Sequence, residues 1–443
     1  MVQYLQRAGE NALRRSAYQE AIGLLTKGLE LLNLLLDTPE RTQQELALSL
    51  ALVTSLIATK GYGSPEVERA CARAHKLCEQ LGETPGLFFV LGNLCSVYHN
   101  RGEFQKAHTL AEQLLRLAQS THDPVLLVWA HAAMGVNLRY MGQLVTARHH
   151  LERASSLYDS QKHHAYGFVQ DPGVMCLGYL SILLWVMGYP DQALQRSHEM
   201  LALAKQLTHP YSLAYALNGA AEAHRLCGQL PAAHELETAV QVLSHEHGFP
   251  FWLADGTIFQ GWDWVQQGQG KEGIAHMCHG MAALRTQGVK LGWSHICGML
   301  ATAYGQIGQP AEGLRVLVEA MESEDNMNKG ALYRIKGELT LQQESQRAKG
   351  KGQKSKILNP KSQILDPQSE AEACFLKAIE ISQKQQAKSL ELRAVTSLAR
   401  LWQQQGKRKE ARQLLAEIYD WFTEGFDTKD LQEAKTLIEE LGH

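Results

Sequence analysis

The amino-acid sequence predicts an all-α protein, a right-handed superhelical solenoid of about ten helical hairpins. Three observations lead to this prediction. A short phrase centred on glycine returns along the chain at a spacing close to 40 residues. Apolar residues make up 45% of the 443 residues and charged residues 20%, and only 12 residues are proline. Such a chain has much apolar surface to bury and few helix breakers, and a fixed period of this length is typical of stacked repeats.

The repeated phrase places a glycine at the end of one helix and a small residue five positions later, inside the next helix. Counted on the small residue, the spacing is 40 from Ala107 to Ala147, 46 from there to Ala193, and 40 for each of the next three steps. The seven copies are Gly102 with Ala107, Gly142 with Ala147, Gly188 with Ala193, Gly228 with Ala233, Gly268 with Gly273, Gly308 with Gly313, and Gly406 with Ala411.

Each part of this phrase has a mechanical reason. Glycine adopts the left-handed conformation that ends a helix without steric cost, and the short connection that follows predicts an antiparallel hairpin. The small residue lets the two helices of a hairpin approach closely. The first helix alternates large, small and large side chains, as in Met134, Gly135 and Leu138. This alternation predicts knob-into-hole contacts along one helical face.

The repeats divide the chain into four regions. Residues 1–80 hold less regular hairpins, 81–341 hold the repeats of about 40 residues, and 369–443 hold further repeats and a capping helix. The region 342–368 is a basic, polar insert that contains two near-copies of a seven-residue string. One interpretation of the insert is a patch for nucleic acid or anionic lipid. Its lack of aromatic residues favours a disordered surface loop instead.

Charge and composition exclude several classes of protein. Lys and Arg number 43 against 46 Asp and Glu, so the net charge of −3 offers no global field for nucleic acid or an anionic membrane. The eight cysteines include no C-x-x-C pair and are expected to be reduced thiols in a cytoplasmic protein. The first residues lack the pattern of a secretory signal, and the most apolar run, 174–188, is too short to span a bilayer.

A search for catalytic and metal-binding motifs finds none with the required spacing. His276 and His279 form a pair at i, i+3, but no third ligand lies at a recognisable distance. Gly268 to Lys271 has two glycines before a lysine, yet the spacing of a phosphate loop fails because Glu272 follows. The sequence therefore predicts a non-catalytic protein without cofactor or metal.

The phrase resembles the tetratricopeptide repeat. In that family the first helix reads Trp-x-x-Leu-Gly-x-x-Tyr, and the second has an alanine followed four residues later by a bulky residue. Ala147 with Leu151, and Gly313 with Leu317, keep the second spacing. The unit of this chain is longer than the family's repeat of about 34 residues, which implies longer helices or loops. The resemblance implies a superhelix whose inner groove is the place for binding.

Family positions that line the groove translate into a set of candidate binding residues. Arginine and tryptophan are frequent at binding hot spots, which makes these positions worth singling out. An alternative stays open for the three tryptophans, which could equally be core residues between adjacent hairpins. The candidates are Asn100, Trp129, Arg139, Tyr140, Trp185, Tyr215, Asn218, Glu222, Arg225, Asp255, Trp262 and His295.

Several longer strings carry a more particular resemblance. They are Lys60–Ala70, Gln170–Val174, Gly248–Leu253, Leu332–Leu339, Ser389–Trp402 and Trp421–Leu431. Together they resemble the C-terminal tetratricopeptide region of bacterial class III adenylate or guanylate cyclases fused to a STAND-type ATPase. In that family a cyclase and an ATPase module precede the repeats, and neither is recognised in this chain. The resemblance implies a sensor or scaffold arm that biases such a module.

Three functions follow from these observations. The first is a scaffold that binds a protein partner, such as a cyclase or ATPase module, in its groove. The second is a receptor whose pocket between hairpins holds a small-molecule effector. The third is the regulatory piece of a cyclase, called an enzyme only by association. None of the three predicts a nucleic acid or membrane partner.

Overall fold

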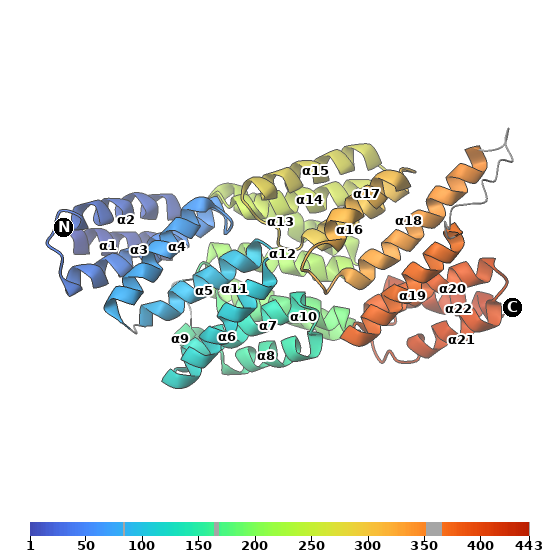
Figure 1. Cartoon of the computed structure of the whole chain (residues 1–443), viewed down its shortest axis with the longest axis horizontal. Helices are drawn as coiled ribbons and strands as arrows, with labels where there is room; N and C mark the ends of the chain where they lie inside the picture. Colours follow the sequence, from blue (N-terminus) through green and yellow to red (C-terminus); the bar gives the residue numbers. More distant parts are fainter. Residues whose placement is uncertain (83–84, 164–167, 351–365, 443) are drawn as a thin grey trace, which may run out of the picture. The chain divides into compact units, whose positions relative to one another are not determined.

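The computed structural model describes residues 1–82, 85–163, 168–350 and 366–442 (Figure 1). These residues form α-helices and no strand, so the predicted fold class, an all-α tetratricopeptide-like solenoid of about ten hairpins, is confirmed. The hairpins are α1 (Val2–Arg14) with α2 (Tyr18–Leu32), α3 (Pro39–Lys60) with α4 (Pro65–Leu81), α5 (Pro85–Asn100) with α6 (Phe104–Thr121), α7 (Pro124–Tyr140) with α8 (Leu144–Leu157), α10 (Pro172–Val186) with α11 (Pro190–Leu207), α12 (Pro210–Leu226) with α13 (Leu230–His247), α14 (Pro250–Gln266) with α15 (Gly270–Thr286), α16 (Trp293–Gln306) with α17 (Pro310–Met321), α18 (Lys329–Gly350) with α19 (Pro367–Gln385), and α20 (Lys388–Gln404) with α21 (Arg408–Tyr419). A short α9 (Ser160–His163) and a final α22 (Lys429–Gly442) complete the helices.

Proline and small polar residues fix where the helices begin. Ten of the helices start at a proline, whose missing N–H costs nothing in the first turn. The side chains of Thr38, Ser64 and Asp123 each accept a hydrogen bond from a backbone N–H of the helix that follows. Asp171 does the same for α10, accepting from the backbone N–H of Gly173 at 2.9 Å.

The repeated glycines end the first helix of their hairpins as predicted. All seven have positive φ, between 74° at Gly308 and 96° at Gly188. At Gly142 the backbone N–H donates to the Arg139 carbonyl, and the next N–H donates to the Leu138 carbonyl. The same pair of hydrogen bonds recurs at the other six glycines and satisfies carbonyls that the helix end leaves free.

Small residues bring paired helices together, also as predicted. A Cβ atom added at Gly135 would lie 2.6 Å from Leu151 Cγ, so no larger residue fits there. A Cβ atom added at Gly337 on α18 would lie 2.6 Å from Phe375 Cε1 on α19. These two helices therefore pair although the insert separates them in the sequence. Helix α18 continues to Gly350, so the first nine residues of the insert expected at 342–368 are helical rather than unstructured. Residues 351–365 lie outside the described residues.

The chain divides into two compact units. The N-terminal unit comprises Met1–Leu183, Ala193–Phe259 and Cys278–Leu291, and the C-terminal unit comprises Leu184–Gln192, Gln260–Met277 and Gly292–His443.

Within the N-terminal unit, hairpins that are far apart in the sequence touch. The Asn100 carbonyl accepts the backbone N–H groups of Lys290 and Leu291 at 2.7 and 3.0 Å. The turn after α3 meets the end of α15 so closely that a Cβ atom at Gly63 would lie 2.3 Å from the Gly288 carbonyl oxygen. Repeats in this unit therefore contact more than their sequence neighbours.

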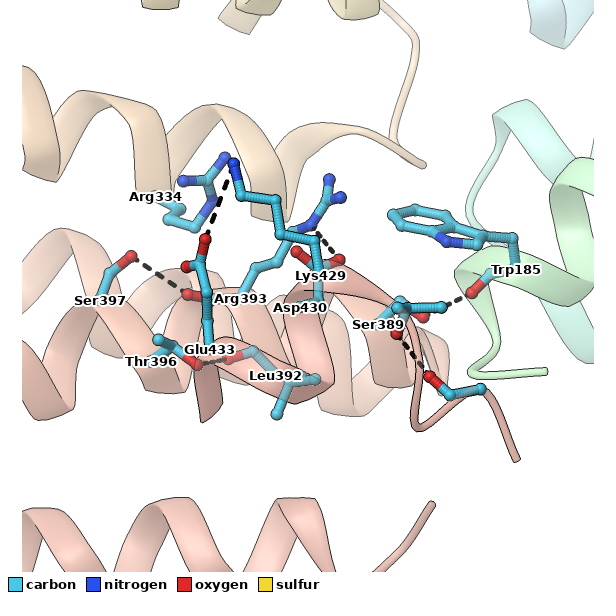
Figure 2. Close-up of polar contacts among 12 residues, drawn as sticks. Trp185, Arg334, Ser389, Leu392, Arg393, Thr396, Ser397, Lys429, Asp430 and Glu433 are labelled. Carbon is cyan, nitrogen blue, oxygen red and sulfur yellow. Dashed lines mark hydrogen bonds and ion pairs between the residues drawn. The ribbon is translucent and has the colours of Figure 1, made fainter. Parts of the chain in front are cut away.

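The C-terminal unit has an apolar core and its own long-range contacts. Ala371, Phe375 and Leu398 are among the buried core residues of α19 to α22. The Ser389 hydroxyl donates to the Trp185 carbonyl at 2.5 Å, across 204 residues of sequence (Figure 2). The Glu424 carboxylate accepts the backbone N–H groups at the start of α11. Among the described residues, no helix is both long and apolar enough to cross a membrane.

Candidate binding site

Several predicted groove residues converge on one polar cluster in the N-terminal unit. The polar cluster consists of Arg139 on α7, Tyr179 on α10, Asn218 and Glu222 on α12, and Asp255 on α14. Helices α7, α12 and α14 are first helices of their hairpins, as is α10. The repeat therefore brings the same face of four successive hairpins to one place, which is what a groove made of first helices requires.

Arg139 supplies the buried positive charge of the polar cluster. The side chain is 5% exposed, and its guanidinium carbon lies 5.0 Å from the Tyr140 ring centroid and 5.3 Å from that of Tyr179. Cation–π contact of this kind stabilises a desolvated arginine. Burial raises the pKa of Tyr179 to about 12; Arg139 lowers this pKa and Glu222 raises it. Both charges therefore act on one phenol.

Asp255 and Glu222 supply the negative side of the polar cluster. Burial raises the pKa of Asp255 to about 7, and the Glu222 carboxylate raises it further in the same direction. A hydrogen bond from Asn218 and the charge of Arg225 oppose this rise. The side chains of Asn218, Glu222 and Asp255 are partly exposed. A carboxyl group with a pKa near neutrality in a partly enclosed site is a common sign of a functional position.

Arg225, also predicted, has a structural partner of its own. Its guanidinium forms an ion pair with Glu237 of α13, and both side chains are almost fully buried. The guanidinium carbon also lies 4.1 Å from the centroid of the Phe259 ring on α14. Removing either charge would leave the other buried without compensation, which is strongly destabilising. Arg225 therefore holds α12, α13 and α14 around the polar cluster.

A small cavity adjoins the polar cluster through Tyr179. Its volume is about 70 Å³, and Asn93, His99, Asn137 and Trp129 are among its walls. The His99 Nδ1 lies 3.1 Å from the Asn137 amide oxygen, and the Nε2 lies 3.4 Å from the Tyr179 hydroxyl. Burial lowers the pKa of His99 to about 4, so the ring is neutral at pH 7. In this arrangement Nδ1 donates to Asn137 and Nε2 accepts from Tyr179.

A larger hollow borders the first hairpins of the N-terminal unit. It has a volume of about 740 Å³, within the usual range of ligand sites. Tyr18, Thr54 and His209 are among its walls, and it shares Phe168 and Gln170 with the small cavity. The two spaces are therefore neighbours in the N-terminal unit, with these two residues in the walls of both.

The remaining predicted residues lie elsewhere. Asn100 and Trp129 are buried in walls of the small cavity, and Trp129 packs on Phe168 with ring centroids 3.9 Å apart. Trp185 is buried in the C-terminal unit, where the Arg393 guanidinium carbon lies 4.6 Å from its ring centroid (Figure 2). Trp262 and His295 also belong to the C-terminal unit and are partly exposed. Neither belongs to the polar cluster.

Sequence reasoning missed polar residues that lie one or two positions from the family positions in the sequence. His99 directly precedes Asn100, and Asn137 lies two residues before Arg139. Tyr179 was overlooked because α10 is apolar nearly throughout. The available signal was a polar side chain inside an apolar first helix, because such a residue needs a partner in the interior.

Comparison with known proteins supports the repeat assignment. Residues 392–417, in α20 and α21, match the family model of the tetratricopeptide repeat. The chain is similar to a Rap protein solved in complex with competence and sporulation factor, with a TM-score of 0.59 and 11% identity over 87% of this chain and 98% of that one. This likeness shows the fold. No curated protein sequence matches the chain.

Two further solved structures are similar at lower TM-scores. The quorum sensor NprR of B. thuringiensis, in its apo form, has a TM-score of 0.46 and 13% identity over 87% of this chain and 99% of that one. A STAND protein of Pyrococcus horikoshii with a tetratricopeptide repeat sensor has a TM-score of 0.42 and 13% identity over 89% of this chain and 55% of that one.

Proposed function

We propose that the chain is a non-catalytic sensor arm whose N-terminal unit binds a polypeptide partner at the polar cluster. The observation that carries this proposal is the convergence of Arg139, Asn218, Glu222 and Asp255, which come from three different hairpins and present both signs of charge. Mixed charges in a partly desolvated recess favour recognition of a defined partner over general adhesion. The similar Rap protein, solved with a bound factor, supports the same use of the fold.

The partner that the sequence resemblance suggests is a cyclase or STAND-type ATPase module in the bacterial cytoplasm. The arm would bias that module when its own site is occupied. A nucleotide cyclase assay on the isolated chain tests the non-catalytic part of the proposal. Activity above that of a mock preparation would contradict it.

Capture of partners by the full chain tests the binding site. Glu222→Gln and Asp255→Asn keep the shape of the side chain and remove the negative charge. Glu235→Gln, on the exposed face of α13, is the matched control. We expect a protein that copurifies with the wild-type chain and the control to be depleted at least about tenfold by the double change, equivalent to about 1.4 kcal/mol. An identical set of partners for all three proteins would contradict the proposal.

A small-molecule effector is the second candidate, favoured by the cavity beside Tyr179. The indole Nε1 of Trp129 is buried there without a hydrogen-bond partner among the described residues. A ligand with one hydrogen-bond acceptor would satisfy it, which is worth about 1–3 kcal/mol. A thermal-shift screen of metabolites tests this candidate, because a ligand raises the stability of the folded state. Saturable stabilisation that is lost in Trp129→Phe would support it.

A further inference from the structure

Four histidines gather on three consecutive helices of the N-terminal unit, apart from the polar cluster. They are His108 on α6, His131 on α7, and His149 and His150 on α8. The rings of His131 and His150 face each other with their Nδ1 atoms 2.9 Å apart and their centroids 5.1 Å apart. Both are partly exposed, so solvent reaches the pair.

The contact between the two Nδ1 atoms allows only one proton between them. One ring donates its Nδ1–H, and the other accepts with its lone pair. Burial lowers the pKa of His131 to about 4, and the neighbouring His150 lowers it further. Burial and the charge of His149 lower the pKa of His150 as well. Both rings are therefore neutral at pH 7, which is the form that binds metals.

His108, on the neighbouring hairpin, is not a third ligand of this pair. Its Nε2 lies 3.7 Å from a carboxylate oxygen of Glu112. Among the described residues, no third histidine, cysteine, aspartate or glutamate has a ligand atom within 4.8 Å of both Nδ1 atoms. His131 and His150 are therefore the two members of the group that could share one ion.

We propose that His131 and His150 bind one divalent first-row transition-metal ion, such as Ni²⁺, Cu²⁺ or Zn²⁺. Imidazole nitrogen suits all three ions. Two nitrogens bound at about 2.0–2.1 Å to one ion lie roughly 3 Å apart, close to the separation of the two Nδ1 atoms. When the ion binds, the proton on Nδ1 of the donor ring is replaced and the same ring takes a proton at Nε2. The charge therefore balances without net release of protons at pH 7.

Isothermal titration calorimetry on the full chain tests this site directly. The chain should carry no polyhistidine tag, and NiCl₂, CuCl₂ and ZnCl₂ are titrated separately. We expect one tight equivalent for at least one ion, weakened at least about tenfold by either His131→Gln or His150→Gln. His198→Gln is the matched control, because His198 also faces a second histidine across two helices, with ring centroids 5.8 Å apart.

Thermal unfolding with and without metal separates binding from folding. In EDTA the variants and the wild-type chain should unfold at similar temperatures, and the metal should raise the temperature only where both His131 and His150 are present. The two histidines lie on different helices, so if one variant fails to fold, the other variant still tests the site. An equal affinity in wild type and both variants, or no saturable binding of any of the three ions, would overturn the proposal.

Discussion

The two units use the same repeat but partner their buried polar groups differently. In the N-terminal unit, first helices place Arg139, His99 and Asn137 in the interior, and the carboxylates of Glu222 and Asp255 act on each other across hairpins. In the C-terminal unit, α19 to α22 hold an apolar cluster, and buried carboxylates such as those of Asp325 and Glu391 accept hydrogen bonds from near neighbours in the sequence, Asn328 and Lys388. Its ion pairs, such as Arg393 with Asp430 (Figure 2) and Arg400 with Glu433, stay partly exposed. The glycine phrase is nevertheless common to both units.

This difference indicates that the repeat sets the scaffold and that the residues between the repeat positions set the function. Some hairpins have alanine and others glycine at the same repeat position, because this residue only controls how closely the helices pack. Polar side chains in the interior need specific partners, and in the N-terminal unit several hairpins supply them. The N-terminal unit is therefore the better place for recognition, and the C-terminal unit is the better place for stability.

The largest effect should come from the contact between distant hairpins of the N-terminal unit. Gly63→Ala would push a methyl group into the Gly288 backbone, which cannot move aside as a side chain can. We expect a loss of about 2–4 kcal/mol in the free energy of unfolding, the size of a severe packing clash. Gly23→Ala is the control, because it is exposed on α2 with no atom nearby, and should stabilise by about 0.5–1 kcal/mol. Equal urea midpoints for the two variants would contradict the contact.

The next effect concerns the carboxylates of the polar cluster. The folded-state pKa of Asp255, about 7, lies above its ordinary value. Between about pH 4 and 7 the folded chain therefore holds more protons than the unfolded chain, and this residue makes stability fall as the pH rises. Asp255→Asn cannot titrate, so its stability relative to wild type should increase by about 1–3 kcal/mol from pH 5 to pH 8. Urea unfolding at several pH values measures this difference. Glu235→Gln, the surface control, should show no such rise.

A smaller effect is expected for Arg393, whose guanidinium covers the Trp185 ring in the C-terminal unit. Arg393 donates to Asp430 at 2.8 Å and lies over the Trp185 ring. Arg393→Ala should reduce the free energy of unfolding by about 1–2 kcal/mol, since a cation–π contact and a half-exposed ion pair are lost together. It should leave partner capture unchanged, because these residues belong to the C-terminal unit and the proposed binding site belongs to the N-terminal unit. Loss of the partner in this variant would indicate that binding uses the C-terminal unit, which would contradict the proposal.

The smallest effect is expected for an exposed pair of the same unit. Arg400 and Glu433 are about half exposed, with side-chain exposures of 50% and 39%. Exposed ion pairs contribute little because water and salt screen them. Arg400→Ala should change the free energy of unfolding by less than about 0.5 kcal/mol, as measured by chemical denaturation. A loss as large as that of Arg393→Ala would show that exposure does not distinguish the two pairs.

The sequence was sufficient for the hairpins and for part of the site. Glycine spacing located every helix-ending turn of the seven copies. Family positions also led to Arg139, Asn218, Glu222 and Asp255. The contact of Gly63 with Gly288 had no signal, because periodicity reports only on neighbouring hairpins. His99 and Asn137 were missed because they lie one and two residues from the family positions, which changes the face a side chain occupies. Tyr179 was missed because α10 is apolar nearly throughout.

Hydrogen–deuterium exchange on the full chain, with and without a partner that it captures, tests the central claim most directly. Binding at the polar cluster should slow exchange in the second half of α7 and along α12 and α14, the helices that carry its charged residues. Asp255→Asn together with Glu222→Gln should remove that protection while exchange in α20 to α22 stays the same. Protection confined to α20 to α22 would contradict the claim that the N-terminal unit is the binding site.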